Sequence, residues 1–170
     1  MLIYKRENSH NNMQNMNNIN IIHGDLLTQE VDVIVNPWNR NFIPWWLLLP
    51  QGVSGAIKKK AGFRPFVELS KVGILPLGGA ILTGAGKLPY KGIIHVAGLN
   101  AFWVSTEKSI RQSVRSAMQI VNEHGFQSVA FPLIGAGTGG KKSELVQQWI
   151  VETLNAQPTN AEIKVIIYKS

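Results

Sequence analysis

The sequence contains no cysteine, which excludes disulfide bonds, thiolate metal sites and cysteine nucleophiles. Charge is sparse as well, because only 16% of the 170 residues are Asp, Glu, Lys or Arg. No apolar run approaches the roughly 18 residues of a membrane-spanning helix, and the N-terminus lacks a signal-peptide pattern. The four histidines are scattered without the spacing of metal ligands, so we expect no metal and no cofactor. These absences predict a soluble, cytoplasmic protein that does not contact membranes.

The charge that is present is mostly positive. Seventeen Lys and Arg residues against ten Asp and Glu give a formal net charge of +7, which favours small polyanions and nucleic acid alike. Basic clusters stand at Lys58–Lys60 and Lys141–Lys142, and three lysines on one helix are more often a solvated face. No RNA-binding sheet motif or DNA-reading helix pair is recognisable. Nucleic acid therefore stays an open but unsupported partner.

Length and apolar content predict one globular domain over residues 1–170, since 45% of the residues are apolar. Short apolar runs alternate with helical patterns, which is typical of a three-layer α/β/α domain with a mixed, largely parallel sheet. An edge strand is expected at 2–4, followed by an Asn-rich loop at about 8–18. The further expected strands are Ile19–His23, Val31–Val35, Gly79–Thr83, Gly92–Val96, Ser128–Phe131 and Ile163–Tyr168, and the expected helices are Gly52–Lys60, Arg64–Leu69, Thr106–Glu123 and Ser143–Leu154.

A glycine-rich loop follows one of the expected buried strands. The segment from Val129 to Lys142 reads as a strand, then a loop with four glycines, then the start of a helix. Glycines let the backbone approach an anion closely, and a helix N-terminus adds partial positive charge, so this layout indicates a diphosphate site. A nucleotide-hydrolysing P-loop would need Ser or Thr where Lys142 stands, which argues against that alternative.

Six segments in this order resemble the successive signature segments of the macro domain family. They are INIIHGDLL (19–27), VIVNPWN (33–39), GVSGAI (52–57), LTGAGKLP (82–89), IIHVAG (93–98) and AFPLIGAGTGG (130–140). Each segment alone is a weak signal, and the order and spacing of all six carry the resemblance. Macro domains bind ADP-ribose and related nucleotides, and many remove ADP-ribose from macromolecules or acetyl groups. The resemblance therefore implies ADP-ribose, or an ADP-ribosylated macromolecule, as the partner.

The resemblance also assigns roles to individual residues. Asp25, with Leu26 beside it, matches the contact to the adenine amino group, although Gly-Asp is more commonly a turn or helix cap. Asn39 matches the asparagine that contacts the distal ribose, whereas Asn36 is interpreted as a structural residue that braces the loop backbone. The two phosphate loops correspond to Gly52, Val53, Ser54 and Gly55 and to Gly135, Ala136, Gly137, Thr138 and Gly139.

The family's familiar catalytic groups are missing. In the common hydrolytic branch an aspartate of the first loop orients the attacking water, and Ser54 stands at that position. Another branch uses a lysine and an aspartate where Gly98 and Gly139 stand, and the glutamate pair of poly(ADP-ribose) glycohydrolases is absent too. A serine is a poor base without a partner, so any hydrolysis would need Asn39 to orient the ribose and Ser54 to hold the water. His95 is expected to be a packed strand residue.

A Trp-rich insert at about residues 40–50 is bulkier than the usual glycine-rich loop. It is interpreted as a lid beside the distal ribose, as core filling by Trp45 and Trp46, or as a partner surface. Three functions stay open: hydrolysis of an ADP-ribose linkage by a variant mechanism, ADP-ribose binding without catalysis, and a nucleic-acid or protein interaction module. The sequence settles neither the enzymatic question nor the oligomeric state.

Overall fold

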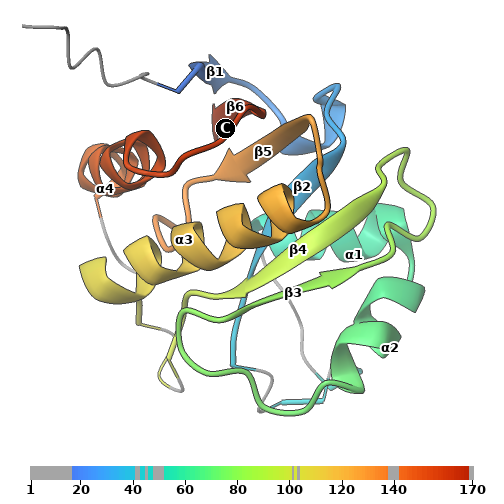
Figure 1. Cartoon of the computed structure of the whole chain (residues 1–170). Coiled ribbons are helices and arrows are strands. Elements are labelled where there is room, and N and C mark those ends of the chain that lie inside the picture. Colours follow the sequence, from blue (N-terminus) through green and yellow to red (C-terminus); the bar gives the residue numbers. More distant parts are fainter. Residues whose placement is uncertain are drawn as a thin grey trace, which may run out of the picture.

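A computed structural model describes residues 17–40, 43–44, 46–47, 52–100, 102, 104–137 and 142–168 (Figure 1). These residues form a six-stranded sheet with the order β1-β6-β5-β2-β4-β3. All neighbouring strands are parallel except β3 and β4, which are antiparallel. The predicted α/β class with a mixed, largely parallel sheet is therefore confirmed. The expected strand at 2–4 and most of the Asn-rich loop lie outside the described residues.

The elements agree closely with those expected from the sequence. The strands are β1 (Ile19–His23), β2 (Val33–Trp38), β3 (Ala80–Thr83), β4 (Gly92–Ala97), β5 (Ser128–Pro132) and β6 (Glu162–Ile167), and the helices are α1 (Gly52–Ala61), α2 (Arg64–Ser70), α3 (Glu107–Glu123) and α4 (Ser143–Asn155). No helix among them is long and apolar enough to cross a membrane. The main differences concern the second strand and the turn that precedes it.

The turn at Gly24–Thr28 contains a short 3-10 helix, η1 (Leu26–Thr28), which the sequence analysis did not predict. Asp25 caps it, because its carboxylate accepts a hydrogen bond from the Leu27 amide at 2.8 Å. Leu26 is buried and faces the core on the side of α1. The chain then reaches β2 two residues later than expected.

The second strand also runs three residues further than expected, through Pro37 to Trp38. Proline lacks the amide donor of a central strand and would ordinarily end it. The pairing of β2 with β5 stops at Ile34, however, while the pairing with β4 continues to Trp38. Pro37 therefore lies where the ladder has only one partner strand.

Each face of the sheet is covered by two helices. The α3 and α4 side packs against alternate strand residues such as Val35, Val96 and Phe131. The α1 and α2 side packs against the residues between them, including Ile34, Trp38 and Ile93. Because the central strands are buried on both faces, they read as continuous apolar runs in the sequence.

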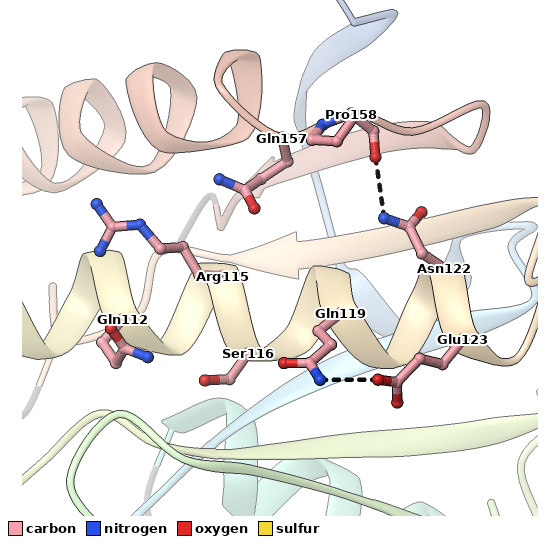
Figure 2. Close-up of a pocket in the computed structure, with 8 residues that line it drawn as sticks. All are labelled: Gln112, Arg115, Ser116, Gln119, Asn122, Glu123, Gln157 and Pro158. Atoms are coloured by element: carbon pink, nitrogen blue, oxygen red, sulfur yellow. Dashed lines mark hydrogen bonds between the residues drawn. The ribbon is translucent and has the colours of Figure 1, made fainter.

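The two ends of helix α3 were predictable because each carries a signal in the sequence. Thr106 caps the first turn, and its hydroxyl and that of Ser109 exchange hydrogen bonds with each other's backbone amides. The helix ends before Gly125, which adopts the left-handed φ of 65° that glycine tolerates. Its outer side carries polar residues such as Gln112 and Gln119 (Figure 2), as the amphipathic pattern predicts.

A fully buried histidine lies beneath α2. The His95 ring approaches the Asn36 amide at 3.0 Å and the Thr83 hydroxyl at 2.9 Å. With Asn36 donating to Nδ1, the ring proton resides on Nε2 and is donated to Thr83. The phenyl ring of Phe66 packs edge-on against the imidazole at 5.6 Å. Asn36 therefore anchors a histidine inside the sheet, which corrects the expectation that it braces the loop backbone.

Burial lowers the pKa of His95 to about 3. A neutral ring suits this apolar site, because an imidazolium there would lack both solvent and a counter-charge among the described neighbours. The expected role of His95 as a packed, hydrogen-bonded residue is confirmed. A group this buried and this difficult to protonate is unsuited to act as a general base toward an external substrate.

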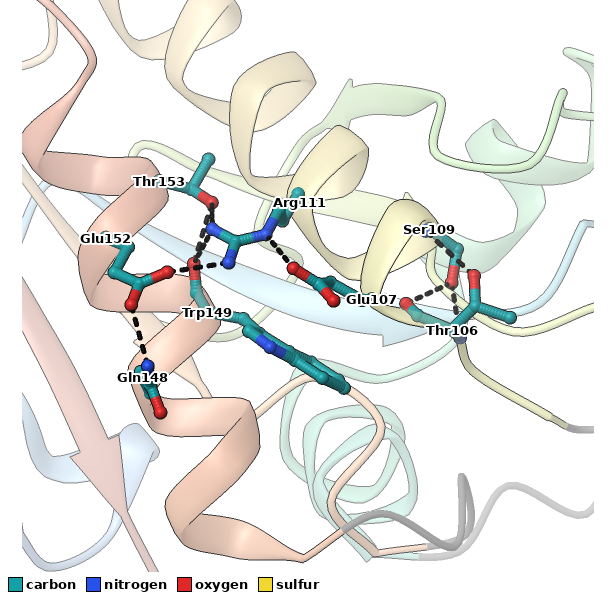
Figure 3. A network of polar contacts seen from close by, with 8 residues as sticks. All are labelled: Thr106, Glu107, Ser109, Arg111, Gln148, Trp149, Glu152 and Thr153. Atoms are coloured by element: carbon teal, nitrogen blue, oxygen red, sulfur yellow. Dashed lines mark hydrogen bonds and ion pairs between the residues drawn. The ribbon is translucent and has the colours of Figure 1, made fainter.

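Helices α3 and α4 are joined by a network around Arg111 (Figure 3). Its guanidinium contacts Glu107 at 2.7 Å on its own helix and Glu152 at 2.6 Å on α4. It also donates to the Trp149 carbonyl at 3.3 Å and the Thr153 hydroxyl at 3.1 Å. The hydrogen bonds to Glu152 and Glu107 raise the pKa of Arg111. One side chain thus satisfies acceptors near the middle of α4 and fixes the two helices side by side.

The first prediction concerns acid stability. Unfolded His95 binds a proton below about pH 6.5 and the folded ring does so only near pH 3, so lowering the pH through this interval favours unfolding. The free energy of unfolding should therefore lose up to about 4 kcal/mol from His95 alone between pH 6.5 and 3.5. Urea titrations at several pH values should show that the stability difference between wild type and His95→Gln changes by this amount. Replacing the exposed His124 by Gln is the control, and a difference that stays constant with pH would contradict the account.

The second prediction concerns Arg111. The Arg111→Met variant keeps the aliphatic stem but loses the bonds to α4, so the free energy of unfolding should fall by about 1–2 kcal/mol. Arg115→Met, one turn later on the polar side of α3, removes the same charge and should change it by less than about 0.5 kcal/mol. Urea denaturation measures both. Equal effects of the two substitutions would show that the network adds nothing beyond charge.

Candidate functional site

The predicted ligand residues lie where parallel strands end. Asn39 follows β2, and the Leu133–Gly137 turn follows β5, the neighbouring strand. Asp25 follows β1, and the Gly24 amide continues the ladder by donating to the Ile167 carbonyl of β6. Carboxyl ends of parallel strands meet at one edge, which is the usual place for ligands in such sheets. With neighbouring strands about 4.8 Å apart, the edge from β1 to β2 spans about 14 Å.

The predicted first phosphate loop is the first turn of α1. Gly52 begins the helix in a left-handed conformation with φ 58°, and Val53, Ser54 and Gly55 follow it within the helix. The first amides of a helix have no intrahelical acceptor and point along the axis, so this end attracts anions. The turn is close to the central strand, because α1 packs on β2 through the buried Ile57.

Ser54 is the one polar side chain of this turn. It is buried at 7% exposure, and its hydroxyl has no hydrogen-bond partner among the described residues. A buried hydroxyl without a partner costs free energy, so it is a position where a bound water or ligand oxygen is favoured. Asn39, the other candidate at this end, is buried at 5% exposure.

The described part of the predicted second loop has two glycines, and their surroundings differ. Gly135 adopts φ 81°, and a side chain there would collide with Ser105, so it is required by the fold itself. A Cβ placed on Gly137 would instead meet no heavy atom of the described residues within 4 Å. Ala136 lies between them and is half-buried. Thr138 and Gly139, the remaining predicted residues of this loop, are outside the described residues.

Asp25 performs its structural role with one oxygen and leaves the other exposed toward Lys60. The first oxygen caps η1, which is the commoner use of Gly-Asp weighed above. The second lies 3.9 Å from the Lys60 ammonium at the far end of α1. Capping by one oxygen does not occupy the second, so the structure is compatible with both uses of this carboxylate.

Sequence reasoning missed two aromatic residues near Asp25. Tyr168 follows β6 directly and is 70% exposed, next to the Gly24–Ile167 contact that joins the two strand ends. Tyr90 donates to the Leu26 carbonyl at 3.3 Å, and burial together with the Asp25 charge raises its pKa. A terminal aromatic after the last strand carries no motif, so only the sheet order could place it beside residue 25.

The site is poor in groups that can accept a proton. The segments 33–67, 97–106 and 131–143 contain no Asp, Glu or His. Neither predicted phosphate loop therefore supplies a general base. At Gly98, where one family branch has a lysine, a Cβ would lie 2.7 Å from the Ile134 side chain. No group of three or more His, Asp or Glu among the described residues is placed to hold a metal ion.

The Trp-rich insert is only partly described. Trp46 is 67% exposed and Leu47 is 62% exposed, so the core-filling interpretation is wrong for Trp46. Trp45 lies outside the described residues. Ile43, at the start of the insert, does pack against the core on the α1 side.

Two surface hollows have no predicted ligand residue in their lining. One, of 340 Å³, follows the polar outer side of α3 and is lined by residues including Arg115, Gln119 and Asn122 (Figure 2). In it Gln119 donates to Glu123 at 2.7 Å, and Asn122 donates to the Pro158 carbonyl at 2.9 Å. The other, of 490 Å³, lies beside the start of β2 and is lined by residues including Asp32 and Tyr90. Their polar side chains largely bind each other, which is typical of a solvated surface.

Comparison with known proteins identifies the family of this chain. A family model for the macro domain matches residues 35–150. A Citrobacter rodentium protein named O-acetyl-ADP-ribose deacetylase is 34% identical over 145 residues, which cover 81% of this chain and 78% of that protein. An Oceanobacillus iheyensis macrodomain variant solved with ADP-ribose has a TM-score of 0.73 and 27% identity, covering 89% of this chain and 86% of the other. Another variant of that macrodomain has a TM-score of 0.75 and 26% identity over 91% of this chain and 86% of the other.

The family model covers more than half of the chain, and its match contains Asn39, both described parts of the phosphate loops and all strands between them. The sheet order and the glycine-bearing strand ends come from the structure alone and agree with it. This chain belongs to the macro domain family.

Proposed function

We propose that this chain binds ADP-ribose, free or attached to a macromolecule, along the edge from Asp25 to Asn39. Two observations carry the proposal: a helix N-terminus at Gly52 on a helix that packs against β2, and an unfilled space at Gly137 after the adjacent parallel strand β5. The backbone amides of these two turns would hold the diphosphate. The related macrodomain solved with ADP-ribose supports this ligand.

The two ends of the ligand would meet different side chains. The free oxygen of Asp25 would accept a hydrogen bond from the adenine amino group, and Tyr168 offers an exposed ring for stacking beside it. Asn39 would contact the distal ribose at the other end. Residues 138–139 complete the second loop in this proposal, as the family resemblance implies.

Hydrolysis is the second proposed function, and the buried Ser54 hydroxyl favours it. Relatives named O-acetyl-ADP-ribose deacetylase suggest an acyl ester of ADP-ribose as the substrate to test. Because neither loop supplies a carboxylate or imidazole, Ser54 would hold the attacking water and Asn39 would orient the ribose. Such a reaction would depend on positioning rather than on a protein general base.

A substitution at Gly137 tests the binding site. The Gly137→Val side chain enters space that no described residue fills, so folding should be unaffected while the diphosphate is excluded. Calorimetric titration should show micromolar or tighter binding of ADP-ribose to wild type and an affinity loss of at least about a hundredfold in the variant, equivalent to about 2.7 kcal/mol. AMP is the ligand control, and Gly137→Ala should weaken binding less. Unchanged affinity in Gly137→Val would place the diphosphate elsewhere.

A substitution at Ser54 separates hydrolysis from binding. If its hydroxyl holds the attacking water, Ser54→Ala should lower the kcat for O-acetyl-ADP-ribose by about tenfold, the effect of losing one hydrogen bond of about 1.4 kcal/mol. The affinity for ADP-ribose should stay within about twofold. Turnover is measured by chromatography of the ADP-ribose that is released. No turnover by wild type, with affinity intact, would identify a protein that binds ADP-ribose without hydrolysing it.

A further inference from the structure

The excess positive charge is concentrated in one part of the fold. Residues 58–91 contain seven Lys or Arg and a single Glu, whereas residues 92–168 contain six Lys or Arg and five Glu. The first stretch forms the end of α1, all of α2 and the β3–β4 loop, on the same side of the sheet. The α3 and α4 layer on the other side is nearly balanced, and two of its acidic residues, Glu107 and Glu152, are paired with Arg111.

Four basic residues of this stretch converge at the C-terminal end of α1. Lys59 and Lys60 lie in its last turn, and Arg64 begins α2. The β3–β4 loop joins them, because the Lys87 amide donates to the Ala61 carbonyl at 3.0 Å. The Lys87 side chain passes over Gly62, with its Cε 3.9 Å from where a Cβ of that glycine would stand.

The acidic residues nearby offset only part of this charge. Arg64 lies 3.6 Å from Glu68 and Lys60 lies 3.9 Å from Asp25, both exposed pairs at long distances. No ion pair is found for Lys59 or Lys87 within the described part of the chain. The surface therefore keeps a net positive charge in solution.

An aromatic residue lies between Lys60 and Arg64 in the chain. Phe63 is 62% exposed and occupies the junction between α1 and α2, one residue from Arg64. Lysine clusters alone are commonly solvated faces, and the exposed phenyl ring adds an aromatic surface to this one. A ring that stacks bases, surrounded by cations that track phosphates, is the arrangement by which proteins bind single-stranded nucleic acid.

We propose that the α1–α2 corner, defined by Lys59, Lys60, Phe63, Arg64 and Lys87, binds single-stranded nucleic acid. Phosphates would contact the four cations, and a base would stack on Phe63. Duplex DNA fits less well, because its bases are already stacked and present no face to the ring. The corner is separate from the phosphate loops, since the ten residues of α1 span about 15 Å between its two ends.

The corner is oriented toward one end of the proposed ADP-ribose site. Lys60 approaches Asp25, so the corner begins beside the residue proposed to contact adenine, not beside Asn39. A nucleic acid bound at the corner would therefore approach the cleft from its adenine end. This orientation allows both ligands to bind the same molecule.

Fluorescence anisotropy with labelled 12-nucleotide oligo(dT) and oligo(U), and with a 12-base-pair duplex, tests the proposal. We expect single strands to bind at about 1–100 µM in 50 mM salt, with a slope of log affinity against log salt near −3 for four neutralised phosphates. Comparison of oligo(dT) with oligo(U) distinguishes DNA from RNA. Equal or tighter binding of the duplex, or no binding of either single strand, would overturn the proposal.

Two pairs of variants locate the surface. Lys59→Gln combined with Lys87→Gln should weaken binding at least tenfold and reduce the salt slope by about 1.4, whereas Lys108→Gln with Arg115→Gln removes equal charge from α3 and should change little. Phe63→Ala should weaken binding about tenfold, and Phe102→Ala, at another exposed phenyl ring, should not. If a corner variant and its control lose equal affinity for the oligonucleotide, the attraction is non-specific.

The ADP-ribose titration on the same variants keeps this inference distinct from the proposed function. Unchanged ADP-ribose affinity in the corner variants is expected, because none of these residues belongs to the two phosphate loops. If oligonucleotides bind and ADP-ribose does not, the corner proposal stands and the proposed function fails. If ADP-ribose binds and oligonucleotides do not, only the corner proposal is rejected.

Discussion

The burial of β2 between two parallel neighbours is the constraint on which the site depends. Because β5 and β4 pair with it on either side and helices cover both faces, its residues have no solvent face and its register is fixed by the apolar pattern. Its carboxyl end therefore delivers Asn39 to a defined place beside the turn after β5. The α1 helix returns over the same strand and packs against it. The proposed cleft is a consequence of strand order, not of the loops alone.

Within this cleft the protein would rely on backbone dipoles more than on charged side chains. The segments that form the two loops contain no carboxylate or histidine, and the buried His95 is neutral and committed to Asn36 and Thr83. Backbone amides bind a diphosphate without requiring a change of protonation, which suits anion binding over a wide pH range. The same feature limits catalysis, since the proton of an attacking water would have to pass to the ligand or to solvent. Binding is thus the function that the architecture supports most directly.

Much of this fold was predictable because local and tertiary signals agree. Helix α3 has a capping box, an apolar stripe and a terminal glycine, and all three point to the same limits. The C-terminal end of β2 was predicted too early, because a proline such as Pro37 ordinarily ends a central strand. Only the strand pairing shows that this position lacks a second partner strand. The contact of Asp25 with Lys60, and the closeness of Tyr168, depend on residues distant in sequence and leave no local pattern. Family motifs predicted which loops form the site, whereas the charge separation between the two helix layers required the structure.

Helix α1 links the two proposed surfaces through its dipole. Its N-terminal amides would face the diphosphate, and lysines in its last turn are favourable near the partial negative charge of the C-terminus. That effect alone accounts for lysines on the helix, so Lys59 and Lys60 would be insufficient grounds for a binding surface. It does not account for Lys87, which comes from a different loop, or for the exposed ring of Phe63. Convergence of separate segments on one corner is what distinguishes a nucleic-acid surface there from a stabilised helix end.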